Sequence, residues 1–359
     1  MHSSRVVPYL LIFVAVLLAG SGMSADTGAQ PRSDALPASA VVASAPPTRV
    51  SASLPVSRPG RGPSPSFPSL YRLSSLHRAE VISLEVPDEA EAERAAAAGS
   101  AALPILANNQ ILAFYGKPAA KQMGILGEYS KEELGRLLQG YAKLYDDANG
   151  DPGVVPAYYL IYGTCWPGGE IGYLKDSVVQ DYIDYAAAHG MIVFVDHQIG
   201  KYTVEEAMGR LLPFLKYPNV HIALDPEWRT TLPMKEIGSI SAEELNKAEK
   251  MMEDYIEAQG IPGDKMLVVH QFRYSMIQGR EKVRADYEHV QLIHTADGFG
   301  SPSLKRNTYA MNSLASNMPL KGFKLFFKTT VPGAGYDQPL LSPPEVLALE
   351  PKPVLIIYQ

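Results

Sequence analysis

The chain has 359 residues, of which 46% are hydrophobic and 19% charged, and its formal net charge is -6. This size supports one large domain or two small ones. Lysine and arginine are scattered without a basic stripe, which argues against a nucleic-acid partner, because phosphate binding needs clustered cations. A single cysteine, Cys165, excludes an intrachain disulfide framework.

The first 25 residues have the pattern of a secretory signal peptide. Arg5 precedes an apolar run of about 15 residues, Val6 to Gly20, and small residues follow it. The run is shorter than the roughly 20 residues that a membrane-spanning helix needs. We therefore expect a secreted, cell-surface or periplasmic protein with no stable membrane span after cleavage. An uncleaved signal anchor is the alternative.

The next segment has the composition of a linker. Residues 26–69 are rich in Pro, Ser, Ala and Arg, as in SRPGRGPSPSFPS, and cannot bury enough apolar surface to offset the entropy of ordering. We expect disorder there. Residues 70–108 contain VISLEV at 81–86, which has strand character, and a helical stretch at 88–98. We expect this extension to pack on the domain formed by residues 109–359.

From residue 109 onward, apolar runs of strand length alternate with helical stretches, which is typical of a parallel sheet built from β/α units. The strands are expected at 111–116, 154–163, 191–198, 220–227, 265–272, 290–297, 322–330 and 353–358. The helices are expected at 131–148, 177–190, 203–216, 241–260, 276–287, 304–315 and 343–350.

The helix boundaries carry capping signals. Ser130, Thr203 and Ser241 each have a glutamate three residues later, as in a capping box, and Gly190 and Gly260 suit helix C-termini. Eight units in about 250 residues predict a (β/α)8 TIM barrel. A doubly wound sheet is the alternative, but the first expected strand is not followed by a G-x-G-x-x-G turn.

Polar residues gather where the expected strands end, and in a TIM barrel these ends form the active-site mouth. We assign substrate binding to Tyr115, Tyr162, Asp196, Gln198, Trp228, His270, His294, Asp297 and Tyr358. His197, Gln271 and Lys328 are interpreted as structural. Strand alternation turns the first two of these away from the barrel lumen.

Asp225 and Glu227 are the expected catalytic residues. On a continuous strand they share a face and lie about 6.5 Å apart. Mutual repulsion and partial burial raise the pKa of one carboxyl and leave the other ionised, so the first can act as a general acid on a glycosidic oxygen. Glu227 is longer and nearer the mouth, so we assign the acid to Glu227 and the orienting role to Asp225.

The D-x-E pattern at the end of the fourth expected strand resembles that of chitinase-like glycoside hydrolases and of barrel-type lysozymes. The resemblance implies that Glu227 is the acid, that Asp225 steers an N-acetyl group of the substrate, and that this group is the nucleophile. The D-G-x-D-x-D-x-E pattern of chitinases is matched only at Asp225 and Glu227, since Val220, His221 and Ala223 occupy the earlier positions. The segments FYGKP, MGILGEY, LDPEW, VVHQF and DGFG are also similar to exported bacterial TIM-barrel proteins of unassigned function.

These patterns predict a monomeric, exported glycoside hydrolase that acts on a polysaccharide or cell-wall glycan without a cofactor or metal. Two alternatives stay open. A non-catalytic barrel that binds glycan or cell wall suits the long Pro/Ser segment. A metal-dependent hydrolase has enough candidate ligands in Asp196, Asp225, Glu227, His270, His294 and Asp297, although H-x-H after the first strand and H-E-x-x-H are absent.

Overall fold

The computed structural model describes residues 105–359, and in this range eight parallel strands close into a barrel. The barrel strands are β1 (Asn109–Gly116), β2 (Gly153–Cys165), β4 (Ile192–His197), β5 (Val220–Leu224), β7 (Lys265–Gln271), β9 (Val290–Ala296), β10 (Leu320–Leu325) and β11 (Leu355–Tyr358). They are ordered β1-β11-β10-β9-β7-β5-β4-β2, and β2 pairs with β1 to complete the ring. Ala113 of β1, for example, is in register with both Ile357 and Ala157. The predicted (β/α)8 fold is confirmed.

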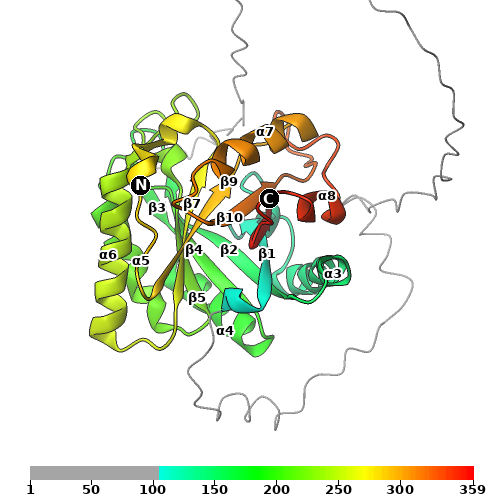
Figure 1. The fold of residues 1–359 in the computed structure, drawn as a ribbon, viewed down its shortest axis with the longest axis horizontal. Coiled ribbons are helices and arrows are strands. Elements are labelled where there is room, and N and C mark those ends of the chain that lie inside the picture. The colour runs from blue at the N-terminus through cyan, green and yellow to red at the C-terminus, as the bar shows by residue number, and fades with distance from the viewer. Residues whose placement is uncertain (1–104) are drawn as a thin grey trace, which may run out of the picture. The chain divides into compact units, whose positions relative to one another are not determined.

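Helices follow the strands and surround the barrel (Figure 1). The α-helices are α3 (Lys131–Asn149), α4 (Asp176–Ala188), α5 (Val204–Leu211), α6 (Ala242–Gln259), α7 (Pro302–Ser313) and α8 (Pro343–Leu347). The 3-10 helices are η2 (Ile105–Ala107), η3 (Ile125–Gly127), η4 (Leu212–Lys216), η5 (Pro226–Trp228), η6 (Tyr274–Met276) and η7 (Arg280–Lys282). None of the helices in residues 105–359 combines the length and the hydropathy that crossing a bilayer requires.

The capping signals act as the sequence indicates. Thr203 with Glu206 and Ser241 with Glu244 form complete capping boxes, and the Ser130 side chain accepts a hydrogen bond from the Glu133 amide. Gly260 ends α6 with a φ of 60°, in the left-handed region that a residue with a Cβ avoids.

Two apolar layers result from the alternation of side chains along the strands. The inner layer fills the lumen and includes Ile111, Ala157, Phe194, Val268 and Ile357. The outer layer lies between strands and helices and includes Leu112, Tyr158, Val193, Val269 and Ile356. Residues of opposite parity on each strand therefore enter different layers, which decides which polar side chains reach the lumen.

Three expected elements differ from the structure. The helix expected at 276–287 is instead η6, the short strand β8 (Ile277–Gln278) and η7, because Gly279 adopts a left-handed φ of 65°. Pro226 ends β5 three residues early, since proline has no amide hydrogen for the strand ladder. β10 ends at Leu325 rather than at residue 330.

Two further short strands lie outside the barrel ring. β3 (Ile171–Tyr173) pairs antiparallel with the end of β2, and β6 (Ile240–Ser241) pairs with β8. The expected signal peptide (1–25), linker (26–69) and most of the extension (70–108) lie outside the described residues and stay predictions.

Candidate active site

Glu227 lies on a short helical turn at the C-terminal mouth of the barrel rather than on a strand. β5 ends at Leu224, Asp225 follows in extended conformation, and Pro226 begins η5, which carries Glu227. Proline fits the first position of a helical turn because its fixed φ suits the turn and its missing donor would be unpaired there. The expectation that both carboxylates continue the strand alternation is therefore wrong for Glu227.

This turn is fixed on several sides. The Asp225 amide donates to the His197 carbonyl at 3.1 Å, and the Gly238 amide donates to the Glu227 carbonyl at 2.6 Å. Arg229 binds both carboxylate oxygens of Glu244 at 2.7 Å, through its two terminal nitrogens. Because Glu244 also completes the capping box of α6, the Arg229 fork ties the turn to the start of that helix.

A connected set of polar side chains fills the lumen below the mouth. Tyr159 and His270 are hydrogen-bonded at 2.7 Å between Oη and Nε2, and His270 Nδ1 lies 3.0 Å from Asp297 Oδ2. Lys324 Nζ donates to the same Asp297 oxygen at 3.1 Å and lies 3.8 Å from the centroid of the Tyr115 ring. These residues come from β1, β2, β7 and β10 and from the residue after β9.

Asp196 and Asp225 complete this lumen cluster, and each keeps one oxygen free. Tyr115 donates to Asp196 Oδ2 at 2.9 Å. Asp196 Oδ1 and Asp225 Oδ1 are buried without a hydrogen-bond partner. A buried carboxylate oxygen without a donor is unfavourable, so both oxygens are acceptors for a bound group or a proton.

The carboxyl groups at the site differ in the direction of their pKa shifts, which is upward for Asp196, Asp225 and Glu227 and downward for Asp297. Burial and the Asp225 charge raise the pKa of Asp196 to about 7. Burial also raises the pKa of Asp225, and burial together with the charges of Asp225 and Asp297 raises the pKa of Glu227 well above its usual range. Protonated carboxyl groups of this kind can donate a proton at neutral pH.

Asp297 differs from these three groups because its pKa is lowered. Burial opposes its ionisation, but the Lys324 charge, the His270 hydrogen bond and the Gly298 amide outweigh burial and hold the pKa of Asp297 well below its usual range. For His270, burial lowers the pKa, but the hydrogen bond to Asp297 and the Asp225 charge outweigh it and the net shift is upward. The site therefore holds an ionised Asp297 beside Lys324 and His270, next to three carboxyl groups whose pKa values are raised.

Comparison with known proteins gives a coarse likeness of fold. No protein-family model and no curated protein matches the chain. Among solved structures, concanavalin B aligns with a TM-score of 0.39 and 10% identity, over 70% of this chain and 93% of that one. A family 18 chitinase from Crocus vernus aligns with a TM-score of 0.35 and 12% identity, over 57% and 82% of the two chains. At such low scores the barrel assignment rests on the strand pairings themselves.

The structure brings five of the expected site residues into the lumen cluster, and Glu227 lies above them. The five are Tyr115, Asp196, Asp225, His270 and Asp297, all at most 5% exposed. Glu227 keeps part of its surface in solvent, and Trp228 follows it on η5 and is half-buried. Glu227 is thus the carboxyl residue of the set that a ligand at the mouth reaches first.

Three expected substrate-binding residues do not face the lumen, and their assignment is corrected. Tyr162 packs on the outer side of β2 against Phe214. His294 lies 2.7 Å from Gln271 Oε1 and contacts Lys321, on the side of the sheet that faces α7. The Tyr358 hydroxyl pairs with that of Tyr145 on α3 at 2.8 Å. The position of each residue along its strand turns its side chain toward the outer layer, between the strands and the helices.

Gln198 has a structural contact instead of a free side chain. Its Oε1 accepts a hydrogen bond from the Cys165 amide at 2.8 Å, which joins the ends of β2 and β4. Cys165 itself is a free, buried cysteine, and burial raises the pKa of its thiol to about 11. A thiol with so high a pKa is a poor nucleophile at neutral pH.

Three residues of the mouth were missed by the sequence analysis. Tyr159 and Lys324 lie inside strands, so neither is marked by a strand end, although both point into the lumen. Trp166 follows β2 directly, is 40% exposed, and has the Lys117 ammonium 5.6 Å from its ring centroid. An aromatic residue immediately after a barrel strand is the sequence signal for Trp166.

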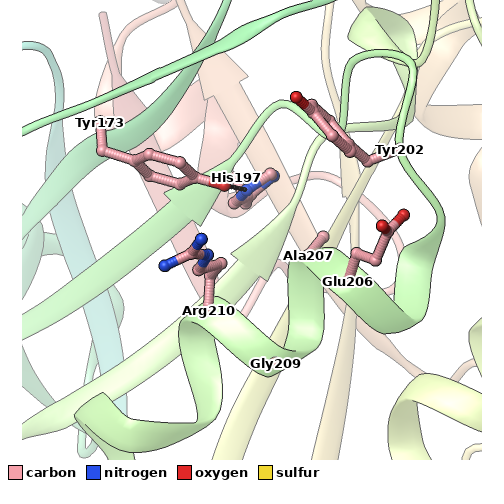
Figure 2. A pocket seen from close by; sticks show the side chains of 7 residues that line it. All are labelled: Tyr173, His197, Tyr202, Glu206, Ala207, Gly209 and Arg210. Atoms are coloured by element: carbon pink, nitrogen blue, oxygen red, sulfur yellow. Dashed lines mark hydrogen bonds between the residues drawn. The ribbon is translucent and has the colours of Figure 1, made fainter.

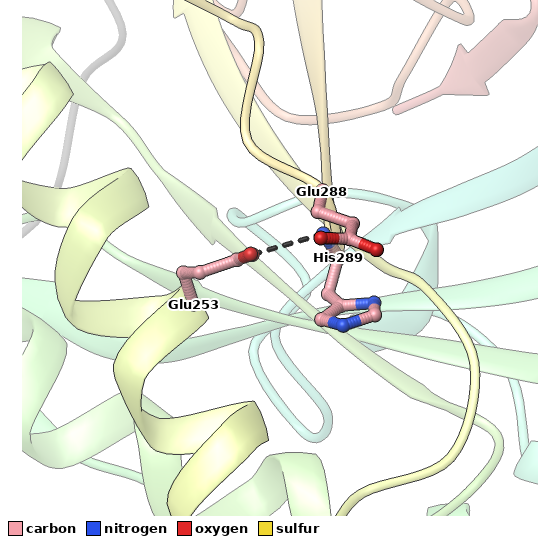
Figure 3. Close-up of side chains that lie close together, drawn as sticks. All are labelled: Glu253, Glu288 and His289. Carbon is pink, nitrogen blue, oxygen red and sulfur yellow. Dashed lines mark hydrogen bonds between the residues drawn. The ribbon is translucent and has the colours of Figure 1, made fainter.

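No three candidate metal-ligand atoms from three different residues of the lumen cluster lie within 4.8 Å of one another. Among the described residues, one group of three ligand atoms lies within 4.8 Å, and it comprises Glu253, Glu288 and His289 at the opposite end of the barrel (Figure 3). There Glu253 of α6 accepts a hydrogen bond from the His289 amide at 2.9 Å, which fastens the segment before β9. In the lumen, Lys324 and His270 both contact Asp297 Oδ2, so the two side chains compete with any metal ion for this oxygen.

Proposed function

We propose that this chain is an exported glycoside hydrolase that acts on a polysaccharide or cell-wall glycan by carboxylate acid/base catalysis. The observation that carries the proposal is the position of Glu227, a partly exposed carboxyl at a barrel mouth whose pKa is raised by burial and by Asp225 and Asp297. A protonated carboxyl at such a place is suited to donate its proton to a glycosidic oxygen.

In this proposal the neighbouring residues orient and balance the charge. Asp225 Oδ1 has no partner and can accept a hydrogen bond from a substrate N–H, in agreement with the orienting role that the chitinase resemblance implies. Asp297 stays ionised beside Lys324 and His270, and its negative charge helps to keep Glu227 protonated until substrate arrives. Trp228 and Trp166 at the rim offer aromatic faces for sugar rings.

The decisive experiment compares wild type with Glu227→Gln on peptidoglycan, chitin oligomers and a panel of soluble glycans, measuring binding and turnover separately. We expect Glu227→Gln to keep binding and to lose at least about 100-fold in turnover, the size of a general-acid contribution. Wild-type turnover is expected to fall as pH rises through the raised pKa of Glu227, because the acid then loses its proton. Glu257→Gln, the same change at an exposed position of α6, serves as the control.

A second function, glycan binding without cleavage, is favoured by the depth of the cluster. Asp196 and His270 are fully buried and Asp225 is 2% exposed, so a glycan at the mouth first meets Glu227 and the rim. Binding without turnover by both wild type and Glu227→Gln would support this function and contradict hydrolysis. Turnover that EDTA abolishes would instead favour a metal-dependent hydrolase.

Export is the part of the proposal that rests on residues 1–25. N-terminal sequencing of protein recovered from the medium or periplasm tests it directly. We expect the mature chain to begin after the apolar run, near residues 23–26. A chain that still begins at Met1 in the membrane fraction would support the uncleaved anchor instead.

A further inference from the structure

A cavity of about 400 Å³ lies outside the barrel lumen, between the β2–β3 hairpin, the end of β4 and helix α5. It is lined by Tyr173, His197, Tyr202, Glu206, Ala207, Gly209 and Arg210 (Figure 2). Tyr173 and Tyr202 lie on either side of His197 in Figure 2, and Arg210 points from α5 toward Tyr173. The lumen cluster contributes no residue to this cavity.

Among the described residues, Arg210 forms no ion pair at this cavity, although the carboxylate of Glu206 lines it too. Two carboxylates of neighbouring segments are engaged elsewhere: Glu170 pairs with Lys201, and Glu205 pairs with Lys247. Glu206 lines the cavity, but one of its oxygens accepts the Thr203 amide in the capping box of α5. No carboxylate of residues 105–359 forms an ion pair with Arg210, whose guanidinium instead lies 5.3 Å from the centroid of the Tyr173 ring. Arg210 also donates a hydrogen bond to the Tyr173 hydroxyl, and because a guanidinium has five N–H donors, others stay available for a ligand.

Tyr173 supplies a second donor, and His197 fixes its direction. His197 Nδ1 accepts the Ile199 amide at 2.9 Å, so the neutral ring carries its proton on Nε2. That nitrogen lies 3.2 Å from the Tyr173 hydroxyl and donates to it. The ring stays neutral, because burial and the Arg210 charge lower the pKa of His197 to about 4. The Tyr173 hydroxyl, which accepts from His197 and from Arg210, therefore keeps its own proton to donate to a ligand.

The two donors and the two rings together select a ligand class. A guanidinium edge beside a hydroxyl donor matches the two oxygens of a carboxylate, and the rings of Tyr173 and Tyr202 offer faces for the C–H bonds of a sugar. We propose that this cavity is a binding site for a carboxylate-bearing sugar of the hexuronic acid class, held by Arg210 and Tyr173. The site is separate from the catalytic mouth, and the proposal holds whether or not the barrel hydrolyses glycans.

Isothermal titration calorimetry of the full chain with D-glucuronate tests this site, with D-glucose as the neutral match and inorganic phosphate as a different anion. We expect wild type to bind D-glucuronate and to bind D-glucose at least tenfold more weakly. Arg210→Gln is expected to weaken D-glucuronate binding tenfold or more, and Tyr173→Phe several-fold. Arg136→Gln, the same charge change at an exposed position of α3, should leave the affinity unchanged.

Four outcomes would overturn the proposal. They are equal affinity of wild type and Arg210→Gln for D-glucuronate, equal affinity of wild type for D-glucuronate and D-glucose, no D-glucuronate binding by wild type at tens of millimolar, and phosphate binding as tight as that of D-glucuronate. Unchanged far-ultraviolet circular dichroism of the variants shows that a loss of binding does not come from unfolding. Glu227→Gln should bind D-glucuronate like wild type, which separates this cavity from the mouth.

Discussion

Lys324 is the residue on which the ionisation of the lumen depends. It is 3% exposed, its ammonium contacts Asp297 at 3.1 Å, and its charge is the largest influence that lowers the pKa of Asp297. The same charge opposes the upward shifts at Glu227 and Asp225. Removing it therefore leaves the buried Asp297 carboxylate with His270 as its remaining side-chain partner.

We expect Lys324→Met to lower the free energy of unfolding by about 3 kcal/mol, because breaking one partner of a buried ion pair leaves an uncompensated charge. Urea unfolding at pH 7 measures the change. Lys328→Met, on an exposed side chain beyond the end of β10, should cost less than about 0.5 kcal/mol. Equal midpoints for the two variants would show that the Lys324 contact contributes no net stability.

Single residues also show where sequence reasoning succeeds. Asp196, Asp225, His270 and Asp297 were recognised because they end strands and have lumen parity. His294 is three positions from Asp297 and Tyr162 three from Tyr159, so the same parity rule turns both outward. The sequence analysis used this parity rule to turn His197 and Gln271 away from the lumen, but it did not use the rule for His294 and Tyr162. Lys324 was missed because the strand was expected to run to residue 330, which placed Lys328 at its end.

At the scale of elements, α6 contains a buried acid that the proposed mechanism does not use. Glu249 is fully buried, neither of its carboxylate oxygens has a hydrogen-bond partner, and burial raises its pKa to about 8. The folded chain therefore holds a proton on Glu249 across a pH range in which the unfolded chain has lost it. By linkage, that difference makes stability fall as pH rises.

We expect Glu249 alone to lower the free energy of unfolding by on the order of 1.4 kcal/mol per pH unit between about pH 4.5 and pH 8. The free energy of unfolding of the Glu249→Gln variant should depend less on pH than that of wild type, by this amount per pH unit. Asp196 titrates near pH 7, but it does so in both proteins and cancels in the difference. Glu257→Gln should keep the wild-type slope. Parallel slopes for wild type and Glu249→Gln, from denaturant titrations at several pH values, would contradict the prediction.

The ends of helices and strands can be predicted from the sequence where capping residues and prolines are taken into account. The capping boxes at Thr203 and Ser241 placed the starts of α5 and α6 to within a residue. Pro226 was recognised as unusual between two acids, yet the strand was continued through it. A proline cannot donate to a ladder, and applying this rule would have ended β5 before Glu227. The short turn and strand at 274–278 depend on contacts with β6 that no local pattern reveals.

At the scale of the whole molecule, the ring of strands closes within residues 109–358. β11 pairs with β1 on one side and with β10 on the other, so the last strand completes the barrel. Every strand of the ring and both apolar layers are contained in this range. The count and spacing of β/α units predicted this architecture, because each unit carries its own periodicity.

We expect a chain of residues 105–359 to unfold cooperatively, with coincident transitions by circular dichroism and tyrosine fluorescence and a melting temperature within a few degrees of that of the full chain. Removing residues 354–359 from it should abolish that transition, since β1 and β10 lose their common neighbour. A shortened chain 105–359 that fails to fold would contradict this prediction and show that residues before 105 are needed for folding.

The sole cysteine has a practical consequence for these experiments. Cys165 lies at the end of β2, buried, with a thiol that is almost wholly protonated at pH 7 to 8 because burial raises its pKa to about 11. Maleimide and iodoacetamide reagents attack the thiolate, so the native protein should take up little label while folded. A cysteine introduced at an exposed position, such as Gly209 beside Arg210, would then be the single reactive handle. A fluorophore attached there could report ligand entry into the outer cavity without any change to the native thiol.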